Sequence, residues 1–452
     1  NIGNGSYSTA DPYVKKVWDG RYTGIRMCNE LLENIDRVPD LDPELKKRYI
    51  GEAKVLRAYN YYELYTKFGD VPYTTKVLSI KESMSIARTA KATVIANVLA
   101  DLDEVINGNY LPTSYDADNK GRITRWAAMA IKAKIYLFEG NWTQVKNITS
   151  TIMTEGGFKL FGSYAGLFEI ANEYNSEVIL DAQYRPTSRE HQMMYVFLPP
   201  TLGGYSQLSP LQELVDSYIM LDGKTIKETG TSFDESHPYA NRDPRLKATV
   251  MYTGNSYTLA DGTEVVINCE KGEGKDGYGV GSDCSATGYY IKKYWDNTYR
   301  ATLYSGLNPI LIRYADILLM NAEALAELGE LDKTAWDATI KPIRDRAGFT
   351  LASALEFPEG ASKDKLIEIV RNERRSELAL EGHRHKDIIR WRIADNVLNG
   401  WCHGLKTNDV VGTDDGYVRV ENRTFNANKH YLWPIPQAER DLNGNLEQNP
   451  NW

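Results

Sequence analysis

Residues 48–73, RYIGEAKVLRAYNYYELYTKFGDVPY, constrain the fold more than any other stretch of the chain. Placed on a helix at about 100° per residue, the apolar residues of this stretch fall on two roughly opposite faces. One face holds Ile50, Ala53, Tyr61, Leu64 and Phe68, and the other holds Val55, Tyr59 and Tyr62. Gly69 and Pro72 then end the helix. A helix that is apolar on two sides needs neighbours on both sides, as in stacked helical hairpins.

The same pattern of a helical run, a glycine and a second helical run recurs along the chain. It occurs at Gly69, Gly140, Gly329 and Gly382, and glycine suits the left-handed position that ends a helix. The runs around Gly140 and Gly329 carry small alanines, which let tetratricopeptide-like hairpins approach closely. Such hairpins stack because none of them can bury its apolar surface alone. The pattern predicts a helical body formed by 12–157 and 308–400.

The stretch from about Phe158 to Leu307 interrupts the repeats and has a different composition. It is rich in Gly, Pro, Ser and Tyr, with strand-like pieces at 177–180 and 263–268 and a hairpin-like turn at 259–264. Loops mounted on a rigid scaffold often carry binding residues. We therefore expect this insert to hold the recognition surface.

Composition limits the partners. The net charge of -8 and the pI near 5.5 argue against a nucleic-acid partner, which normally binds a basic patch. Thirty tyrosines and nine tryptophans can serve as core residues or as stacking platforms for sugars. For any single ring, packing is the preferred interpretation, because burial of a large area is the commonest use of an aromatic side chain.

Several motifs, in the same order, resemble the SusD/RagB family, the outer-membrane nutrient-binding lipoproteins of glycan-degrading Gram-negative bacteria. Beside the helix at 48–73, they are SPLQELVDSYIMLDGK at 209–224, RYADILLMNAEALAELG at 313–329, EIVRNERRSELALEGHRHKDIIRWR at 368–392 and YLWPIPQAERDLNGNLEQNPNW at 431–452. The resemblance extends from about Trp18 to Trp452.

This resemblance implies one mostly α domain of tetratricopeptide-like helical hairpins, with a long insert of loops and short strands. Its parts would be an N-terminal helical part at 1–157, the loop-rich insert at 158–307, and a C-terminal helical part with a closing coil at 308–452. The closing segment contains Pro434 and Pro436, and we expect it to be mostly non-helical and packed across the helical body.

The function implied is that of a non-enzymatic protein on the extracellular face of the outer membrane. It would bind an oligosaccharide, without a cofactor, and deliver it to a SusC-like TonB-dependent transporter. The alternatives are a peptide-binding member of the same family, an α-helical glycoside hydrolase and a protein-binding repeat adaptor.

Attachment to the membrane is also only implied by the resemblance, through an N-terminal lipid anchor that is not present in this chain. No run reaches the roughly 18 apolar residues of a membrane span. Asn1 begins without the basic and apolar segment of a signal peptide. From the residues alone, we expect this chain to be soluble.

The resemblance also indicates where ligand would bind. In better-known members, the sugar-stacking aromatics come from the loop before the motif at 209–224 and from a stretch before the motif matched by Trp18. In this chain these places hold Tyr195, Phe197, Tyr205 and Gln207, and Asn4 and Tyr7. Trp295 is a candidate substitute for the tryptophan that the family often uses, with core packing as its alternative. Tyrosine and phenylalanine in place of tryptophan leave a peptide or a small branched sugar open as the ligand.

No catalytic or metal site is predicted. Glu373, Glu377 and Glu381 recur every four residues, as paired carboxylates of a glycosidase could. Arg371, Arg374 and Arg375 lie among them, so a salt-bridged helix is the preferred interpretation. Neither His383, His385 and His403 nor Asp276 and Asp283 have the spacing of a known metal site.

The four cysteines form no CxxC pair. Cys269 and Cys284 flank a glycine-rich loop, which a disulfide between them would close in an oxidising compartment. Free, buried thiols are the alternative.

Overall fold

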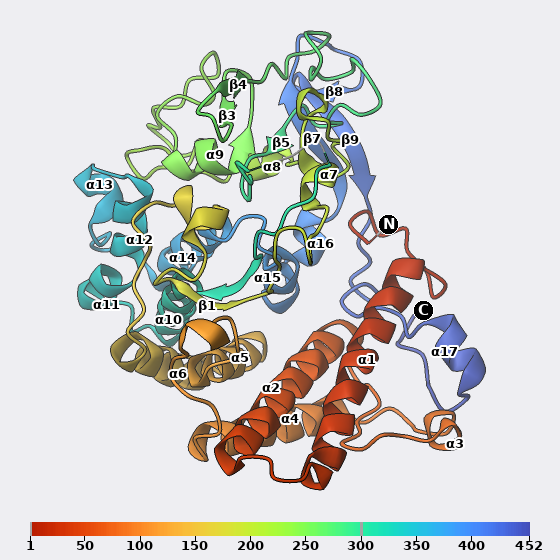
Figure 1. The fold of residues 1–452 in the computed structure, drawn as a ribbon. Coiled ribbons are helices and arrows are strands. Elements are labelled where there is room, and N and C mark those ends of the chain that lie inside the picture. Colours follow the sequence, from red (N-terminus) through yellow and green to blue (C-terminus); the bar gives the residue numbers. More distant parts are fainter. Residues whose placement is uncertain (1, 299–301) are drawn as a thin grey trace. The chain divides into compact units, whose positions relative to one another are not determined.

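A computed structural model describes residues 2–298 and 302–452 of the chain (Figure 1). The contacts group these residues into two compact units. Unit 1 comprises Asn1–Gly156, His385–Asn399 and Arg423–Trp452, and unit 2 comprises Gly157–Arg384 and Gly400–Asn422. The three stretches expected from the sequence are distributed over these two units, and their assignment to one domain stays a prediction.

Unit 1 is built from helices. They are α1 (Pro12–Asn34), α2 (Pro43–Phe68), α3 (Ile80–Ser83), α4 (Lys91–Asn107), α5 (Arg125–Phe138), α6 (Trp142–Glu155), α15 (Arg384–Arg390), α16 (Ala394–Val397) and α17 (Gln437–Leu442). Helix α2 packs against α1, α4 and α5, and α5 packs against α6. In Figure 1, α1, α2 and α4 lie side by side.

The long helices begin where the sequence supplies caps. The carboxylates of Asp11 and Asp42 accept backbone N–H groups at the starts of α1 and α2, and each is followed by a proline at the first helical position. Helix α2 ends at Gly69, whose φ is +71°. The predicted packing on two faces is confirmed, because Val55 and Tyr62 are buried as well as Tyr61 and Leu64.

The C-terminal segment completes unit 1 by binding the end of α2. The Trp433 N–H donates to the Lys67 carbonyl over 2.7 Å, and the Asn449 side-chain amide donates to the Phe68 carbonyl over 2.9 Å. The Trp433 ring packs edge-on against the Phe68 ring, with centroids 5.8 Å apart. Apart from α17, the described segment from Arg423 onward is non-helical, as expected from its prolines.

Unit 2 combines helices with short strands. Its helices are α7 (Met193–Phe197), α8 (Gln212–Val215), α9 (Pro244–Thr249), α10 (Tyr314–Leu328), α11 (Lys333–Ala338), α12 (Ile340–Ala347), α13 (Ala352–Leu355) and α14 (Lys363–Glu377). Its strands are β1 (Val178–Asp181), β2 (Val250–Met251), β3 (Ser256–Thr258), β4 (Glu264–Val266), β5 (Tyr290–Ile291), β6 (Ile310–Arg313), β7 (Gly400–Lys406), β8 (Thr413–Asp414) and β9 (Tyr417–Arg423).

The strands form four small sheets. The pairs β1–β6, β2–β5 and β3–β4 are antiparallel, and the fourth sheet has the order β7-β9-β8. Pairing of β3 with β4 confirms the hairpin expected at 259–264, and Gly262 takes a φ of +83° in its turn. The sheet of β7, β8 and β9 lies outside the strand-like pieces expected from the sequence.

The interior of unit 2 contains ten ionised side chains, which we call the charge network. Its members are Glu177, Asp243, Arg245, Lys293, Arg313, Arg344, Arg346, Glu373, Glu377 and Glu381. Arg313 lies at its centre, because its guanidinium is within 2.8 Å of carboxylate oxygens of Glu177, Glu377 and Glu381. All of these side chains are buried, so the charges pair with one another instead of with water.

The network corrects part of the sequence interpretation. Glu373, Glu377 and Glu381 are ion-paired, as expected, but their partners do not come from the same helix. Arg374 instead pairs with Asp316, and Arg371 with Glu327. The glutamates face α9, β6 and α12 across the core, where arginines of those elements meet them.

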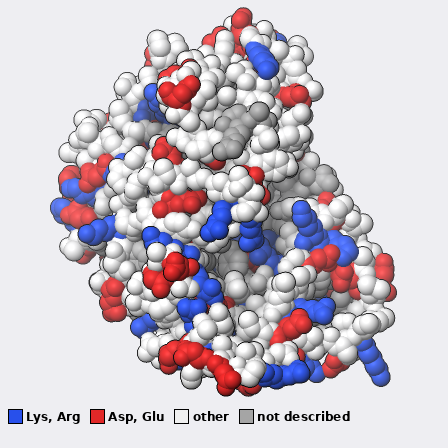
Figure 2. All heavy atoms as spheres, in the orientation of Figure 1, with Lys and Arg blue, Asp and Glu red and all other residues white. Residues whose placement is uncertain are grey.

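The mostly helical fold class is confirmed. Among the described residues, no helix is both long and apolar enough to cross a membrane. On the face drawn in Figure 2, basic and acidic side chains are interspersed, and the described residues of that face form no continuous basic field.

Candidate binding surfaces

The first candidate surface is a pair of tyrosines in unit 2. The rings of Tyr195, on α7, and Tyr205, in the following loop, lie with centroids 4.3 Å apart and planes inclined by 30°. The loop is folded back onto α7, because the Tyr205 N–H donates to the Tyr195 carbonyl over 3.0 Å. Gly204 permits this close approach, since a Cβ there would lie 2.1 Å from the Leu198 carbonyl oxygen. Tyr205 remains 40% exposed, so the pair offers an aromatic surface to solvent.

The other predicted residues of unit 2 are placed differently. Gln207 is exposed in the same loop as Tyr205. Phe197 is buried in the apolar core. Trp295 is half-buried, packs against Tyr257 and donates its indole N–H to the Thr258 carbonyl over 2.8 Å. Of these residues, the structure brings Tyr195 and Tyr205 together, and the ligand contacts themselves stay a prediction.

The two predicted residues of unit 1 lie near its N-terminus. Asn4 is half-buried, and its side-chain oxygen accepts the Ser6 N–H over 3.0 Å. Tyr7 is buried against His430 and Trp452, with ring centroids at 5.3 and 4.8 Å. Burial raises the pKa of Tyr7. The Tyr7 ring therefore packs against the C-terminal segment of unit 1.

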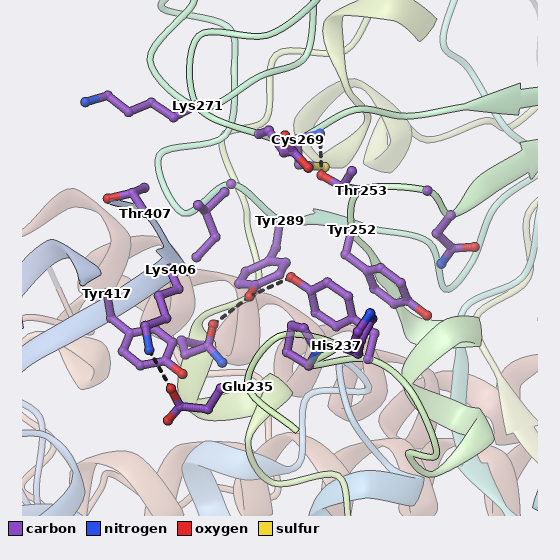
Figure 3. Close-up of a pocket in the computed structure, with 18 of the residues that line it drawn as sticks. Glu235, His237, Tyr252, Thr253, Cys269, Lys271, Tyr289, Lys406, Thr407 and Tyr417 are labelled. Carbon is purple, nitrogen blue, oxygen red and sulfur yellow. Dashed lines mark hydrogen bonds and ion pairs between the residues drawn. The ribbon is translucent and has the colours of Figure 1, made fainter. Parts of the chain in front are cut away.

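A second candidate surface is a cleft of about 930 Å³ in unit 2, which we call the tyrosine cleft (Figure 3). Four of its lining residues are tyrosines from distant places in the unit 2 sequence. The loop before α9 supplies Tyr239, the end of β2 leads to Tyr252, β5 is preceded by Tyr289, and β9 begins with Tyr417. The sequence interpretation missed these four residues, since each looks like any other tyrosine of a chain that has thirty.

Three of the cleft tyrosines are held in fixed positions. Tyr239 and Tyr252 stack with centroids 4.0 Å apart and planes within 17° of parallel. The Tyr239 and Tyr289 hydroxyls are 3.2 Å apart, and the Tyr289 hydroxyl donates to the buried Gln212 side chain over 2.5 Å. Burial raises the pKa of Tyr239 to about 12, so the hydroxyl keeps its proton at neutral pH.

Two ion pairs connect the β7–β9 side of the cleft to its other walls. Lys406 bonds Glu235 over 2.8 Å, and Lys271 pairs with Asp409. Figure 3 shows the Lys406–Glu235 contact beside the Tyr417 ring. All four side chains are substantially exposed, so each pair contributes little to stability.

Several of the side chains considered for catalysis or metal binding form hydrogen bonds and ion pairs with other side chains of the protein. Glu373, Glu377 and Glu381 belong to the charge network and are closed to solvent. His403 lies between Glu213 and Asp414, with its ring nitrogens 2.8 and 3.0 Å from their oxygens. In the part of the chain that the structure describes, no group of histidine, cysteine and acidic residues has the arrangement of a metal site.

The cysteines are free thiols, which settles the two alternatives for Cys269 and Cys284 in this structure. Cys269 is buried, and burial raises the pKa of its thiol. Cys284 is half-exposed, and its Sγ lies 3.3 Å from the Lys275 carbonyl oxygen.

The described chain combines packed helices in unit 1 with aromatic surfaces in the loops of unit 2. Comparison with known proteins identifies its family. The model of the SusD family matches residues 167–452, and a model described as "Starch-binding associating with outer membrane" matches residues 3–137. The chain belongs to the SusD family.

Individual relatives match most or nearly all of this chain in sequence or in fold. SusD-like protein P25 of Formosa agariphila is 28% identical over an alignment of 409 positions, which covers 85% of this chain and 71% of that protein. The crystal structure of a SusD-like carbohydrate-binding protein of Bacteroides fragilis matches with a TM-score of 0.88 and 29% identity, over 99% of this chain and 88% of that one. Surface glycan-binding protein A of Bacteroides fluxus shares the fold, with a TM-score of 0.71 and 22% identity over 99% of this chain and 87% of that one.

Proposed function

We propose that this protein binds an oligosaccharide nutrient at the cell surface and delivers it to a SusC-like TonB-dependent transporter of the outer membrane. Three findings support the proposal. The chain belongs to the SusD family, a similar structure is described as carbohydrate-binding, and one matching family model is described as associating with the outer membrane. The helices act as scaffold, and the loops of unit 2 act as the recognition surface.

The observation that carries the proposal is the open pair of Tyr195 and Tyr205. A pyranose ring presents an apolar face of axial C–H groups, which packs on an aromatic ring, and its hydroxyls bond polar groups at the edge. The exposed Gln207 amide stands in the same loop and offers both a donor and an acceptor. The two rings already lie against each other before binding, so less conformational entropy is lost when a sugar stacks on them.

The Tyr205→Ala variant tests this site. A glycan array first identifies a ligand of the wild-type protein, and titration calorimetry then compares the two proteins. Loss of one stacking ring is expected to weaken binding at least about tenfold, or about 1.4 kcal/mol. The melting temperature should stay nearly the same, because Tyr205 is 40% exposed and lies outside the apolar core of unit 2.

Tyr174→Ala is the matched control, because Tyr174 is 41% exposed and lies in the same unit. It should leave the affinity unchanged. Equal affinities of Tyr205→Ala and the wild type would remove Tyr205 from the site. Product analysis after incubation with the ligand separates a binding protein from an α-helical glycoside hydrolase, since only the hydrolase shortens it. If the array shows no glycan ligand, peptide binding becomes the better description.

A further inference from the structure

The tyrosine cleft is separate from the Tyr195–Tyr205 pair, because neither tyrosine of that pair lines it. Its volume of about 930 Å³ falls within the usual range for small-ligand sites. All its lining residues belong to unit 2. The structure therefore contains a second concave surface that the site predicted from the family resemblance does not explain.

One wall of the cleft is a preformed aromatic surface. Tyr252 is half-buried and stacks on Tyr239, so its ring position is set before any ligand arrives. Tyr239 is fixed in turn through its hydroxyl contact with Tyr289, which bonds Gln212 in the core. Figure 3 shows the rings of Tyr252 and Tyr289 in this wall. Such a wall binds a flat apolar face with little loss of side-chain entropy.

Charged groups of both signs also line the cleft. Four carboxylates and three ammonium groups line the cleft: Glu235, Glu270, Glu273, Asp409, Lys247, Lys271 and Lys406. Two of the lysines are neutralised by the ion pairs with Glu235 and Asp409. The exposed amide of Asn408 adds one more donor and acceptor. A lining with nearly balanced charge gives an anionic or cationic ligand little net attraction.

We infer that the tyrosine cleft is a second binding site, and that it takes a neutral saccharide. An apolar face for the aromatic wall and hydroxyls that both donate and accept are the two properties that the lining requires, and a neutral sugar has both. The inference rests on the proposed function for the class of ligand. It adds a second place of binding, so one protein molecule holds its glycan at two points of unit 2.

Two sites on one unit would change how the protein holds a long chain. A polysaccharide that spans both sites binds the second one as an intramolecular step, so its affinity exceeds that for a short oligosaccharide of the same sugar. Short oligosaccharides would occupy the two sites independently and show a stoichiometry of two.

The test uses titration calorimetry with neutral hexasaccharides of glucose, xylose, mannose and galactose as probes. The wild-type protein should bind at least one of them at two sites, and Tyr205→Ala should retain one. Adding Tyr252→Ala to Tyr205→Ala should weaken the remaining site at least tenfold. Asn408→Trp is the second variant, because it places a bulky ring at the cleft from an exposed bend and leaves the aromatic wall intact.

Each outcome of these titrations supports or overturns the second binding site. A single site that Tyr205→Ala abolishes would overturn the second site and leave the proposed function in place. A site that is unaffected by both Tyr252→Ala and Asn408→Trp would also overturn it. If Tyr205→Ala binds like the wild type and Tyr252→Ala does not bind, the cleft stands and the Tyr195–Tyr205 site fails. Absence of binding to all four probes would overturn the inference, while the glycan array would still decide the proposed function with other ligands.

Discussion

Arg313→Ala removes the central cation of the charge network in unit 2. The guanidinium is 1% exposed and makes short contacts with Glu177, Glu377 and Glu381. Burial alone would raise the pKa of Glu377, but Arg346, Arg313 and Arg245 more than offset it and hold that pKa well below its usual range. In the variant, three buried carboxylates lose a partner, and no water replaces it at full strength.

The expected loss is large for one substitution. Removing one partner of a buried ion pair costs about 3–5 kcal/mol, because a desolvated charge is left without compensation. Unit 2 contains about 250 residues, and for that size each kcal/mol shifts the melting temperature by roughly 2–4 °C. The transition of unit 2 is therefore expected to fall by about 6–20 °C.

Differential scanning calorimetry of the wild type, Arg313→Ala and Arg419→Ala makes the comparison. Arg419 is the matched control, since it lies in the same unit and pairs with Asp414 at the surface, where ion pairs contribute little. Its substitution should leave the transition almost unchanged. A transition of Arg313→Ala that coincides with that of Arg419→Ala would refute the argument that the buried network stabilises unit 2.

Four further predictions follow from the structure. The pKa of Glu381 is lowered to about 2, because Arg313 and Lys293 outweigh the opposing effect of burial. The stability that this carboxylate confers is therefore complete above its ordinary pKa of 4.5 and is lost as the pH falls to about 2. The midpoint of urea unfolding should drop across that pH window, and Glu381→Gln should reduce the drop. Burial lowers the pKa of His385 from 6.5 to about 4, and the nearby charges of Lys67 and Lys386 add to this effect. The free energy of unfolding should therefore decline as the pH falls from 6.5 to 4, and His385→Phe should flatten that decline. Gly288→Ala should lower the free energy of unfolding in urea by at least about 2 kcal/mol, because the new Cβ would lie 1.7 Å from a Leu405 carbon. Gly262→Ala, whose Cβ meets open space, should lower it clearly less. Equal losses in the two variants would contradict the packing argument. Purification from native membranes in gentle detergent should recover a large TonB-dependent protein in near-equal amount, and recovery of this protein alone would count against the partnership.

Several helices of both units could be predicted from sequence because their signals are local. The faces of α2, its end at Gly69 and the glycine turns after α5 and α10 depend on residues within a few positions of one another. The same holds for the hairpin of β3 and β4, whose turn contains Asp261 and Gly262.

The partners in the charge network could not be predicted from sequence. Glu377 has Arg374 and Arg375 beside it, and local spacing favours them as partners. Its actual partners include Arg245, 132 residues away, and Arg313, 64 residues away. Only the packing of α9 and β6 against the end of α14 brings these charges together.

The candidate site was predicted in part for the same reason. Tyr195 lies on α7 and Tyr205 lies ten positions later in the following loop. The motif at 209–224 is next to both, so it indicates where they are. The tyrosine cleft combines residues between Gln212 and Tyr417, which no local pattern links.

The closing of unit 1 by the last described residues bears on the order of folding. Helix α2 leaves its terminal carbonyls at Lys67 and Phe68 for Trp433 and Asn449, which are synthesised more than three hundred and sixty residues later. Until they arrive, the part of the Phe68 ring that meets Trp433 is uncovered, and a newly made N-terminal part exposes apolar surface that promotes association. Contacts between such distant parts of a chain also form slowly. Unit 1 therefore needs Arg423–Trp452 to complete the packing around α2, and a chain cut short before Trp433 should persist as an incompletely folded, aggregation-prone species.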